Sequence, residues 1–149
     1  MNRKHFLKIS SLGLSALSFN TQKSFAVSAS KPIVISTWDG GMAVNAAAWT
    51  VLEKGGRALD AVEVGAIFIE NKIDCCVGLG GYPDRDGIVT LDACIMDEYS
   101  NCGAVGGMED IKHPISVARK VMENSPHVLL VGNGAQQFAL QKGFTKEPK

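Results

Sequence analysis

The order of apolar and polar positions predicts strands and helices in alternation after residue 32. Residues 33–37 form a β-branched run that is typical of a buried strand, and Asp39 with two glycines ends it. Apolar side chains then recur at helical spacing over residues 44–52, and again over residues 58–69, where small residues dominate. We therefore expect a buried strand followed by two closely packed helices that lie against a sheet.

The middle of the chain predicts a long loop and a hairpin. Residues 71–87 lose the helical spacing and are rich in glycine, which favours a loop of unusual length. Residues 88–96 alternate as a strand does, and neither face is fully polar, so we expect a central strand. Residues 102–105 would pair with it across a turn.

The pattern in the last third of the chain predicts a helix, a strand and a second helix. Pro114 suits the first turn of a helix over residues 114–123, and residues 127–131 form another apolar run that is typical of a buried strand. Asn133 with Gln136 resembles a capping box that opens a helix to residue 142. This mixture, without internal repeats, indicates an α/β protein or a layered α+β protein.

The first 29 residues are typical of an export signal. A cationic start precedes an apolar core at residues 9–19 and a small-residue stretch that ends at Ala29. The core is shorter than the roughly 20 residues that a membrane span needs, so no membrane association is expected once the leader is removed. We predict a signal peptide at residues 1–29, a mature domain at residues 30–149, and a periplasmic or secreted protein. The run that starts at Arg3 resembles a twin-arginine signal with lysine as its second member, and a general secretory leader is the alternative.

Charge excludes one class of partner. The chain carries 15 basic and 15 acidic side chains, and all four charged residues of the leader are basic. The mature domain is therefore mildly acidic and has no basic stripe, so nucleic acid is not an expected partner.

The cysteines and histidines do not predict a metal site. Cys75, Cys76, Cys94 and Cys102 lack the paired spacing that zinc sites use. In an exported protein a disulfide is the favoured use, and Cys94 with Cys102 is one of three pairings that include Cys94; buried thiols are the alternative. The predicted leader contains one of the three histidines, and the other two, His113 and His127, are expected to have capping or surface roles.

Two further features have structural rather than catalytic interpretations. The segment Gly78-Leu79-Gly80-Gly81 lacks the flanking strand, helix and Lys-Ser/Thr ending of a phosphate loop, so we expect a turn with positive φ, followed by a solvated ion cluster at residues 84–86. Asp92 lies within an apolar strand, and we expect its carboxylate to anchor neighbouring backbone, with a site role as the alternative.

Several segments, taken together and in this order, carry a family resemblance. They are Ser36-Thr37-Trp38, Gly55-Gly56, Leu59-Asp60-Ala61-Val62-Glu63, Val77-Gly78-Leu79-Gly80-Gly81-Tyr82-Pro83-Asp84, Thr90-Leu91-Asp92-Ala93-Cys94-Ile95-Met96-Asp97, Ile111-Lys112-His113-Pro114-Ile115-Ser116-Val117-Ala118-Arg119 and His127-Val128-Leu129-Leu130-Val131-Gly132. The pattern resembles the α-chain of glycosylasparaginases, within the N-terminal-nucleophile hydrolases, over most of residues 31–144. The motif around Trp38 separates this branch from plant-type asparaginases and isoaspartyl peptidases.

The resemblance implies a four-layer αββα fold, of which this chain holds a part. It also implies a precursor that cleaves itself at a His-Asp-Thr junction, a threonine nucleophile, a glycosylated asparagine as substrate, an αβ homodimer, and no cofactor. From the family we carry over one role, that of Trp38 in bounding the substrate.

Two departures from the family pattern bear on function. No threonine of the chain follows an aspartate, so we expect no catalytic residue here and a catalytic β-chain segment outside these residues. Cys76 stands where the family usually has serine, and a thiol is a weaker hydrogen-bond partner. Three interpretations follow: the amino-terminal part of a glycosylasparaginase that is inactive alone, the same fold acting as an isoaspartyl peptidase or L-asparaginase, or a non-enzymatic exported binding domain.

Overall fold

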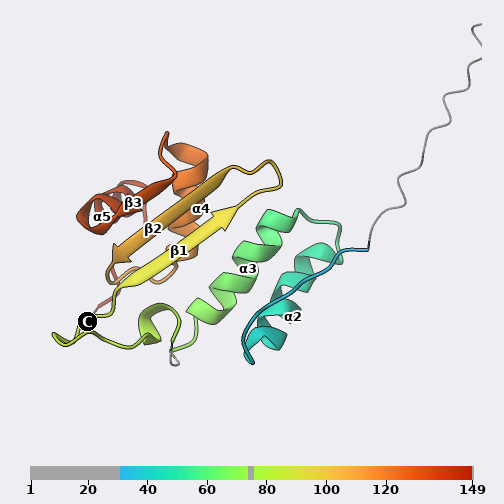
Figure 1. Cartoon of the computed structure of the whole chain (residues 1–149), viewed down its shortest axis with the longest axis horizontal. Helices are drawn as coiled ribbons and strands as arrows, with labels where there is room; N and C mark the ends of the chain where they lie inside the picture. Colours follow the sequence, from blue (N-terminus) through green and yellow to red (C-terminus); the bar gives the residue numbers. More distant parts are fainter. Residues whose placement is uncertain (1–30, 74–75, 149) are drawn as a thin grey trace, which may run out of the picture. The chain divides into compact units, whose positions relative to one another are not determined.

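A three-stranded sheet covered on one face by two helices lies at the centre of the chain (Figure 1). The computed structural model describes residues 31–73 and 76–148, so the predicted leader with its cleavage site, and Cys75, lie outside the described residues. The strands are β1 (Leu91–Met96), β2 (Cys102–Met108) and β3 (Leu129–Val131), in that order across the sheet. The described residues are thus an α/β arrangement, as predicted.

Two helices precede the sheet, at the positions that the apolar spacing predicts. They are α2 (Gly41–Leu52) and α3 (Ala58–Glu70). They pack closely because α3 presents Gly65, where an added Cβ would lie 3.2 Å from a methyl group of Val44 and 3.5 Å from Ala48. The small-residue face therefore packs helix on helix. The expectation that both helices lie against a sheet holds for α3, whose Leu59 lies in the core with Leu91 and Ile95 of β1, but not for α2, which packs on α3.

The hairpin of β1 and β2 is antiparallel and is closed by a turn that Asp97 organises. One oxygen of Asp97 accepts the backbone N–H groups of Tyr99 and Asn101, each at 2.9 Å. At the other end of the hairpin the register shifts between Leu91 and Ala93, and Asp92 accepts the N–H of Gly107 at 2.8 Å. The prediction that Asp92 anchors neighbouring backbone is confirmed.

After β2 the chain leaves the sheet as a helix and then returns to the sheet as a strand. Helix α4 (Pro114–Asn124) connects β2 to β3, which pairs with β2 in parallel, and α5 (Gly132–Gln141) follows. Pro114 occupies the first turn of α4, as predicted. Gly103 allows α4 to cross close to β2, because an added Cβ would collide with the carbonyl oxygen of Ala118 and would lie 2.8 Å from the Cβ of Met122.

Four sequence-based expectations about these elements are wrong. Residues 33–37 form no strand, and Ile33 and Ile35 are 78% and 86% exposed, because none of the described strands lies beside them. Strand β1 lies at an edge of the described sheet and begins at Leu91, so it is not central. Strand β3 is short and two of its three residues are exposed. A β-branched or apolar run indicates strand propensity but does not say which neighbour covers it.

The fourth wrong expectation is the capping box. Helix α5 begins at Gly132, and no side chain caps it. Gln136 instead bonds the backbone of Glu109 twice, accepting its N–H at 3.1 Å and donating to its carbonyl oxygen at 2.9 Å. The local pattern assigned the Gln136 side chain to the helix start. In the structure this side chain instead makes a tertiary contact with the residue that follows β2.

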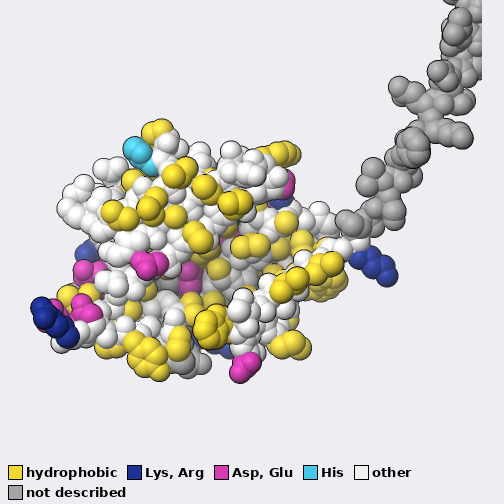
Figure 2. All heavy atoms as spheres, in the orientation of Figure 1, with side chains coloured by type: hydrophobic (Ala, Val, Ile, Leu, Met, Phe, Trp, Pro, Cys, Tyr) yellow, Lys and Arg dark blue, Asp and Glu magenta, His cyan; other side chains and the backbone are white. Residues whose placement is uncertain are grey.

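The sheet has one buried and one open face. Side chains that alternate along β1 and β2, among them Leu91, Ile95 and Val105, pack on α4 and α5. The alternate positions face outward and include Cys94, Met96 and Leu129, the last two 61% and 53% exposed. Figure 2 shows hydrophobic side chains across this side of the molecule with few charged groups among them. Among the described residues, then, no element covers this apolar face.

Within the part of the chain that the structure describes, no helix is long and apolar enough to cross a membrane.

Candidate functional site

A hollow of about 840 Å³ lies between residues 33–41 and the small-residue faces of α2 and α3. Trp38 lines it and is 86% exposed, so its indole is available for contact rather than packed in the core. The floor is formed by apolar side chains of both helices, with Val44 and Ala48 from α2 and Ala61 and Gly65 from α3. The extended segment before α2 is therefore one wall of a concave apolar surface.

The position of Trp38 is set by the start of α2. The N–H of Gly41 donates to the carbonyl oxygen of Trp38 at 2.7 Å, which closes the turn. Gly41 also packs on Ser36, because a Cβ at this glycine would lie 2.5 Å from the Cβ of Ser36. The hydroxyl of Ser36 donates to Oδ1 of Asn45 on the next turn of α2. These contacts hold the chain on both sides of Trp38, at Ser36 and at Gly41.

The start of the glycine loop also lines the hollow. Cys76 and Val77 line it there, ahead of the short 3₁₀ turn η1 (Gly78–Gly80). The φ of Cys76 is 88°, a left-handed conformation that is uncommon outside glycine, and Gly78 has φ 63° as the turn prediction required. The structure thus brings Trp38 and Cys76, the two positions that the family comparison singled out, to the lining of one hollow.

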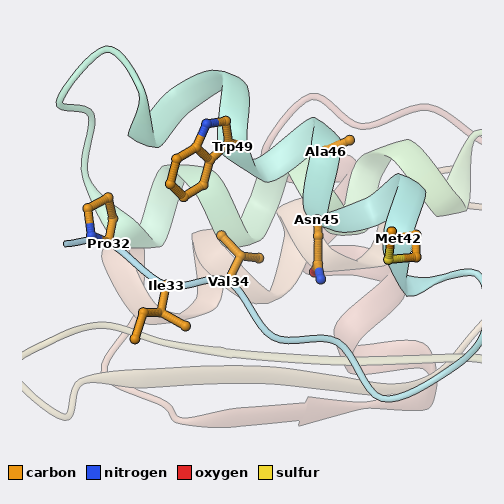
Figure 3. Close-up of a pocket in the computed structure, with 7 residues that line it drawn as sticks. All are labelled: Pro32, Ile33, Val34, Met42, Asn45, Ala46 and Trp49. Atoms are coloured by element: carbon orange, nitrogen blue, oxygen red, sulfur yellow. The ribbon is translucent and has the colours of Figure 1, made fainter.

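A second, shallower hollow of about 390 Å³ lies on the other side of the extended segment (Figure 3). Trp49 and Asn45 point from α2 toward residues 32–34, and Val34 points back toward the helix (Figure 3). Trp49 is 42% exposed, so it is half packed against the segment. This hollow helps to hold the segment that carries Trp38.

The chemistry of the larger hollow is that of binding. Its polar side chains are the Asp39 carboxyl, the hydroxyls of Ser36 and Thr37, and the Cys76 thiol, and its described lining includes no histidine or lysine. Activation of a hydroxyl needs a base within hydrogen-bond reach, and Ser36 is bonded to an amide instead. The lining therefore offers a ligand an apolar surface and an exposed tryptophan.

The remaining candidates from the sequence lie outside this lining. His113 precedes α4, with its Nε2 3.0 Å from Oδ1 of Asn71, and His127 is exposed. Burial lowers the pKa of His113 below its ordinary value, with a smaller contribution from Lys112. His113 is at the N-cap position of α4 but makes no side-chain capping bond, and His127 has the expected surface position, two residues before β3.

Cys94 and Cys102 are thiols rather than disulfide partners in the described structure. Cys94 and Cys102 both face outward from the hairpin, and their strand partners are Ala104 and Met96, so they are diagonal rather than opposite. The pairing of Cys94 with Cys102 is therefore not present. Within residues 31–73 and 76–148, no three histidine, cysteine or acidic side chains gather as metal ligands would.

The charged groups that the sequence did not single out hold the elements together. Arg119 on α4 bonds Asp60 at 2.7 Å and Glu63 at 2.6 Å on α3, and Glu123 at 2.7 Å on its own helix. Partial burial lowers the pKa of Arg119. The hydrogen bonds to these carboxylates, among which that to Glu123 contributes most, raise the pKa, and the net result is a pKa above its ordinary value. Arg57 ties the start of α3 to the hairpin turn through Glu98 at 2.9 Å.

Arg119 and Glu63 both fall inside segments of the family resemblance, which was the available signal. Spacing alone does not pair residues on two different helices, so the sequence could not identify the network.

The chain matches a family model and several curated proteins. The model of the asparaginase family matches residues 9–149. An N(4)-(beta-N-acetylglucosaminyl)-L-asparaginase of Elizabethkingia miricola is 53% identical over 98% of this chain and 45% of its own length. The enzyme of that name from Mus musculus is 51% identical over 78% of this chain and 34% of its own length.

A relative of another activity matches as well. An isoaspartyl peptidase of Salmonella typhimurium is 43% identical over 64% of this chain and 31% of its own length. The chain therefore spans less than half the length of each of these three relatives.

Proposed function

Because the chain belongs to the asparaginase family, we propose that it is the amino-terminal, non-catalytic part of an exported amidohydrolase that converts a glycosylated asparagine to aspartate. The observation that carries this proposal is the hollow that Trp38, Cys76 and Val77 line together with apolar side chains of α2 and α3. Relatives named for this reaction share 53% and 51% identity with the chain and support the choice of substrate.

In this proposal the hollow is one side of the substrate site. The exposed indole of Trp38 offers a rigid flat surface, and the turn at Gly41 fixes its position. Tryptophan gives a large contact area at low entropic cost because it has few rotatable bonds. We assign to Trp38 the role of bounding the asparagine end of the substrate.

The reaction itself is proposed to use a threonine outside these residues. After self-cleavage of the precursor, the threonine hydroxyl attacks the side-chain amide carbon while the α-amino group of the same threonine accepts its proton. The glycosylamine leaves with a proton, and water hydrolyses the resulting ester to release aspartate. This chain contributes binding surface, and its partners would be the catalytic β-chain segment and, in the complete protein, a second αβ unit.

An isoaspartyl peptidase is the second candidate, because a relative of that name is 43% identical to the chain. The two activities differ in the bond that is cleaved and in the group that leaves. Complementing the chain with a catalytic segment and comparing release of aspartate from a glycosylated asparagine with release from an isoaspartyl dipeptide separates them. Faster turnover of the dipeptide would favour the peptidase.

We also propose that the protein is exported and that its leader is removed. The cationic start and the small-residue stretch up to Ala29 support this. Terminal sequencing of protein from the periplasm or medium should give a mature start near Ser30. Cytoplasmic protein that retains residues 1–29 would contradict the proposal.

A further inference from the structure

Three segments meet at one buried carboxyl group, that of Glu70. Glu70 is the last residue of α3 and is 6% exposed. Its Oε1 accepts the N–H of Ile115, in the first turn of α4, at 3.1 Å. On the glycine loop, a Cβ at Gly78 would lie 3.3 Å from the Cα and the carbonyl oxygen of Glu70. The end of α3, the glycine loop and the start of α4 therefore share this joint.

The second carboxyl oxygen of Glu70 has no hydrogen-bond partner among the described residues. Oε2 is a buried side-chain atom that makes no hydrogen bond within the described part of the chain. A carboxylate with a single donor leaves much of its charge uncompensated, whereas a neutral acid avoids that cost. The geometry of the joint therefore favours the protonated form.

The charged groups around the joint do not reverse this preference. On α3, Glu63 adds negative charge, although it is paired with Arg119 of α4. The start of α4 carries Lys112 and His113, and burial lowers the pKa of His113, which favours a neutral imidazole. The turn η1 in the glycine loop brings no charged side chain.

These effects act on Glu70 in opposite directions. Burial raises the pKa of Glu70 to about 7, against the bond from Ile115 and with a further contribution from Glu63.

We propose that Glu70 is a proton-held latch: its neutral carboxyl keeps the glycine loop and the first turn of α4 packed on the end of α3, and ionisation loosens them. Ile69, Cys76 and Val77, which flank this joint, line the Trp38 hollow, so the latch lies behind one wall of that hollow. Because the pKa in the folded chain lies above the ordinary value of 4.5, the support from the latch is complete below about pH 4.5. It is lost as the pH rises through about 7.

The first test is a titration of the protein completed with a catalytic segment from a related enzyme and labelled with ¹³C at its glutamate carboxyl carbons. One resonance, identified by its absence from Glu70→Gln, should titrate with a midpoint near pH 7. Glu63→Gln is the matched control, because it removes a carboxyl from the same helix and should keep that resonance. A Glu70 resonance that titrates near the ordinary pKa of 4.5 would overturn the proposal. This result would mean either that water reaches the joint or that the joint does not form.

The second test asks whether the proton holds the segments. Amide exchange at Ile115 and Gly81, corrected for the intrinsic pH dependence, should become about tenfold faster as the pH crosses the Glu70 midpoint in the parent chain and in Glu63→Gln. In Glu70→Gln the corrected rates should not change with pH. Unchanged exchange in the parent chain, or the same change in Glu70→Gln, would show that the carboxyl is only a packing residue.

Discussion

At the scale of single residues, Trp38 is distinguished by its exposure. A tryptophan that is 86% exposed contributes little to the core, so its removal should affect binding more than stability. In a protein completed with a catalytic segment, Trp38→Ala should raise KM for a glycosylated asparagine about tenfold or more and shift Tm by no more than about 2 °C. Steady-state kinetics and thermal unfolding of the same preparation measure both.

Trp49 provides the matched control for this prediction. It is 42% exposed and packs against residues 32–34 in the shallower hollow, so Trp49→Ala should cost more stability and change KM less. If Trp38→Ala loses activity only in proportion to its loss of folded protein, Trp38 is a structural residue.

Gly41 allows a second residue-level prediction. An added Cβ would lie 2.5 Å from the Cβ of Ser36, so Gly41→Ala must displace the segment that carries Trp38. We expect Gly41→Ala to destabilise the completed protein by about 1–3 kcal/mol and to raise KM as well. Chemical denaturation and kinetics would show this.

The neighbouring glycine serves as the control. Gly40 has helical φ and ψ and no atom within 4 Å of an added Cβ, so Gly40→Ala should change stability by less than about 0.5 kcal/mol. Equal effects of the two substitutions would mean that the contact with Ser36 does not position the segment.

At the scale of elements, a close crossing of helix and sheet lies at Gly103. Helix α4 passes so near β2 that an alanine side chain there would collide with the backbone at Ala118 and Met122. Backbone cannot move aside as a flexible side chain can, so Gly103→Ala should destabilise by about 3 kcal/mol.

Gly134→Ala is the comparison for Gly103→Ala. Gly134 lies within α5 with open space around it, and alanine there should be neutral or stabilise by up to about 1 kcal/mol. Denaturant midpoints of the two variants in the completed protein should therefore move in different directions or by very different amounts. A Gly103→Ala midpoint equal to that of the parent would contradict the close packing of α4.

The elements also show what the sequence can and cannot predict. Helices α2, α3 and α4 follow from apolar spacing and punctuation by glycine and proline, because those signals are local. The strand expected at residues 33–37 and the central position of β1 failed, because burial depends on neighbours that a local pattern does not contain. The capping role of Gln136 failed for a related reason, since Glu109 at the end of β2 competes for its side chain.

The sequence likewise predicted some residues of the candidate site and missed others. Trp38 and the glycine loop were found through the family resemblance, and the structure adds that Trp38 and Cys76 line one hollow. Glu70 was missed, because an acidic residue at the end of an apolar helix is an ordinary helix terminus in sequence terms. Its significance comes from Ile115 and Gly78, which are distant in the chain.

At the scale of the whole molecule, the apolar surfaces that remain open matter most. The outward face of the sheet exposes Met96, Leu129 and Val131, at 61%, 53% and 61%. The lining of the hollow exposes Ile33, Ile35 and Val62, at 78%, 86% and 53%. Open edges and apolar faces of this kind favour aggregation unless other chain segments cover them. We therefore expect residues 30–149 to fold poorly alone.

Restoring a catalytic segment should correct both folding and chemistry. In the four-layer fold that the family implies, the added segment would supply a second sheet against the open face and the threonine nucleophile together. Thermal unfolding should then become cooperative at a concentration where residues 30–149 alone aggregate. A cooperative, monomeric and soluble preparation of residues 30–149 would refute this expectation.

The most direct test of the proposed function is aspartate release from a glycosylated asparagine, measured for residues 30–149 with and without a catalytic segment from a related enzyme. We predict no release above the uncatalysed rate by residues 30–149 alone. The completed protein should release aspartate, and Trp38→Ala should weaken this activity by raising KM. Hydrolysis by residues 30–149 alone would contradict the assignment of the nucleophile to another segment. A completed, folded protein that cleaves no asparagine derivative would contradict the amidohydrolase function.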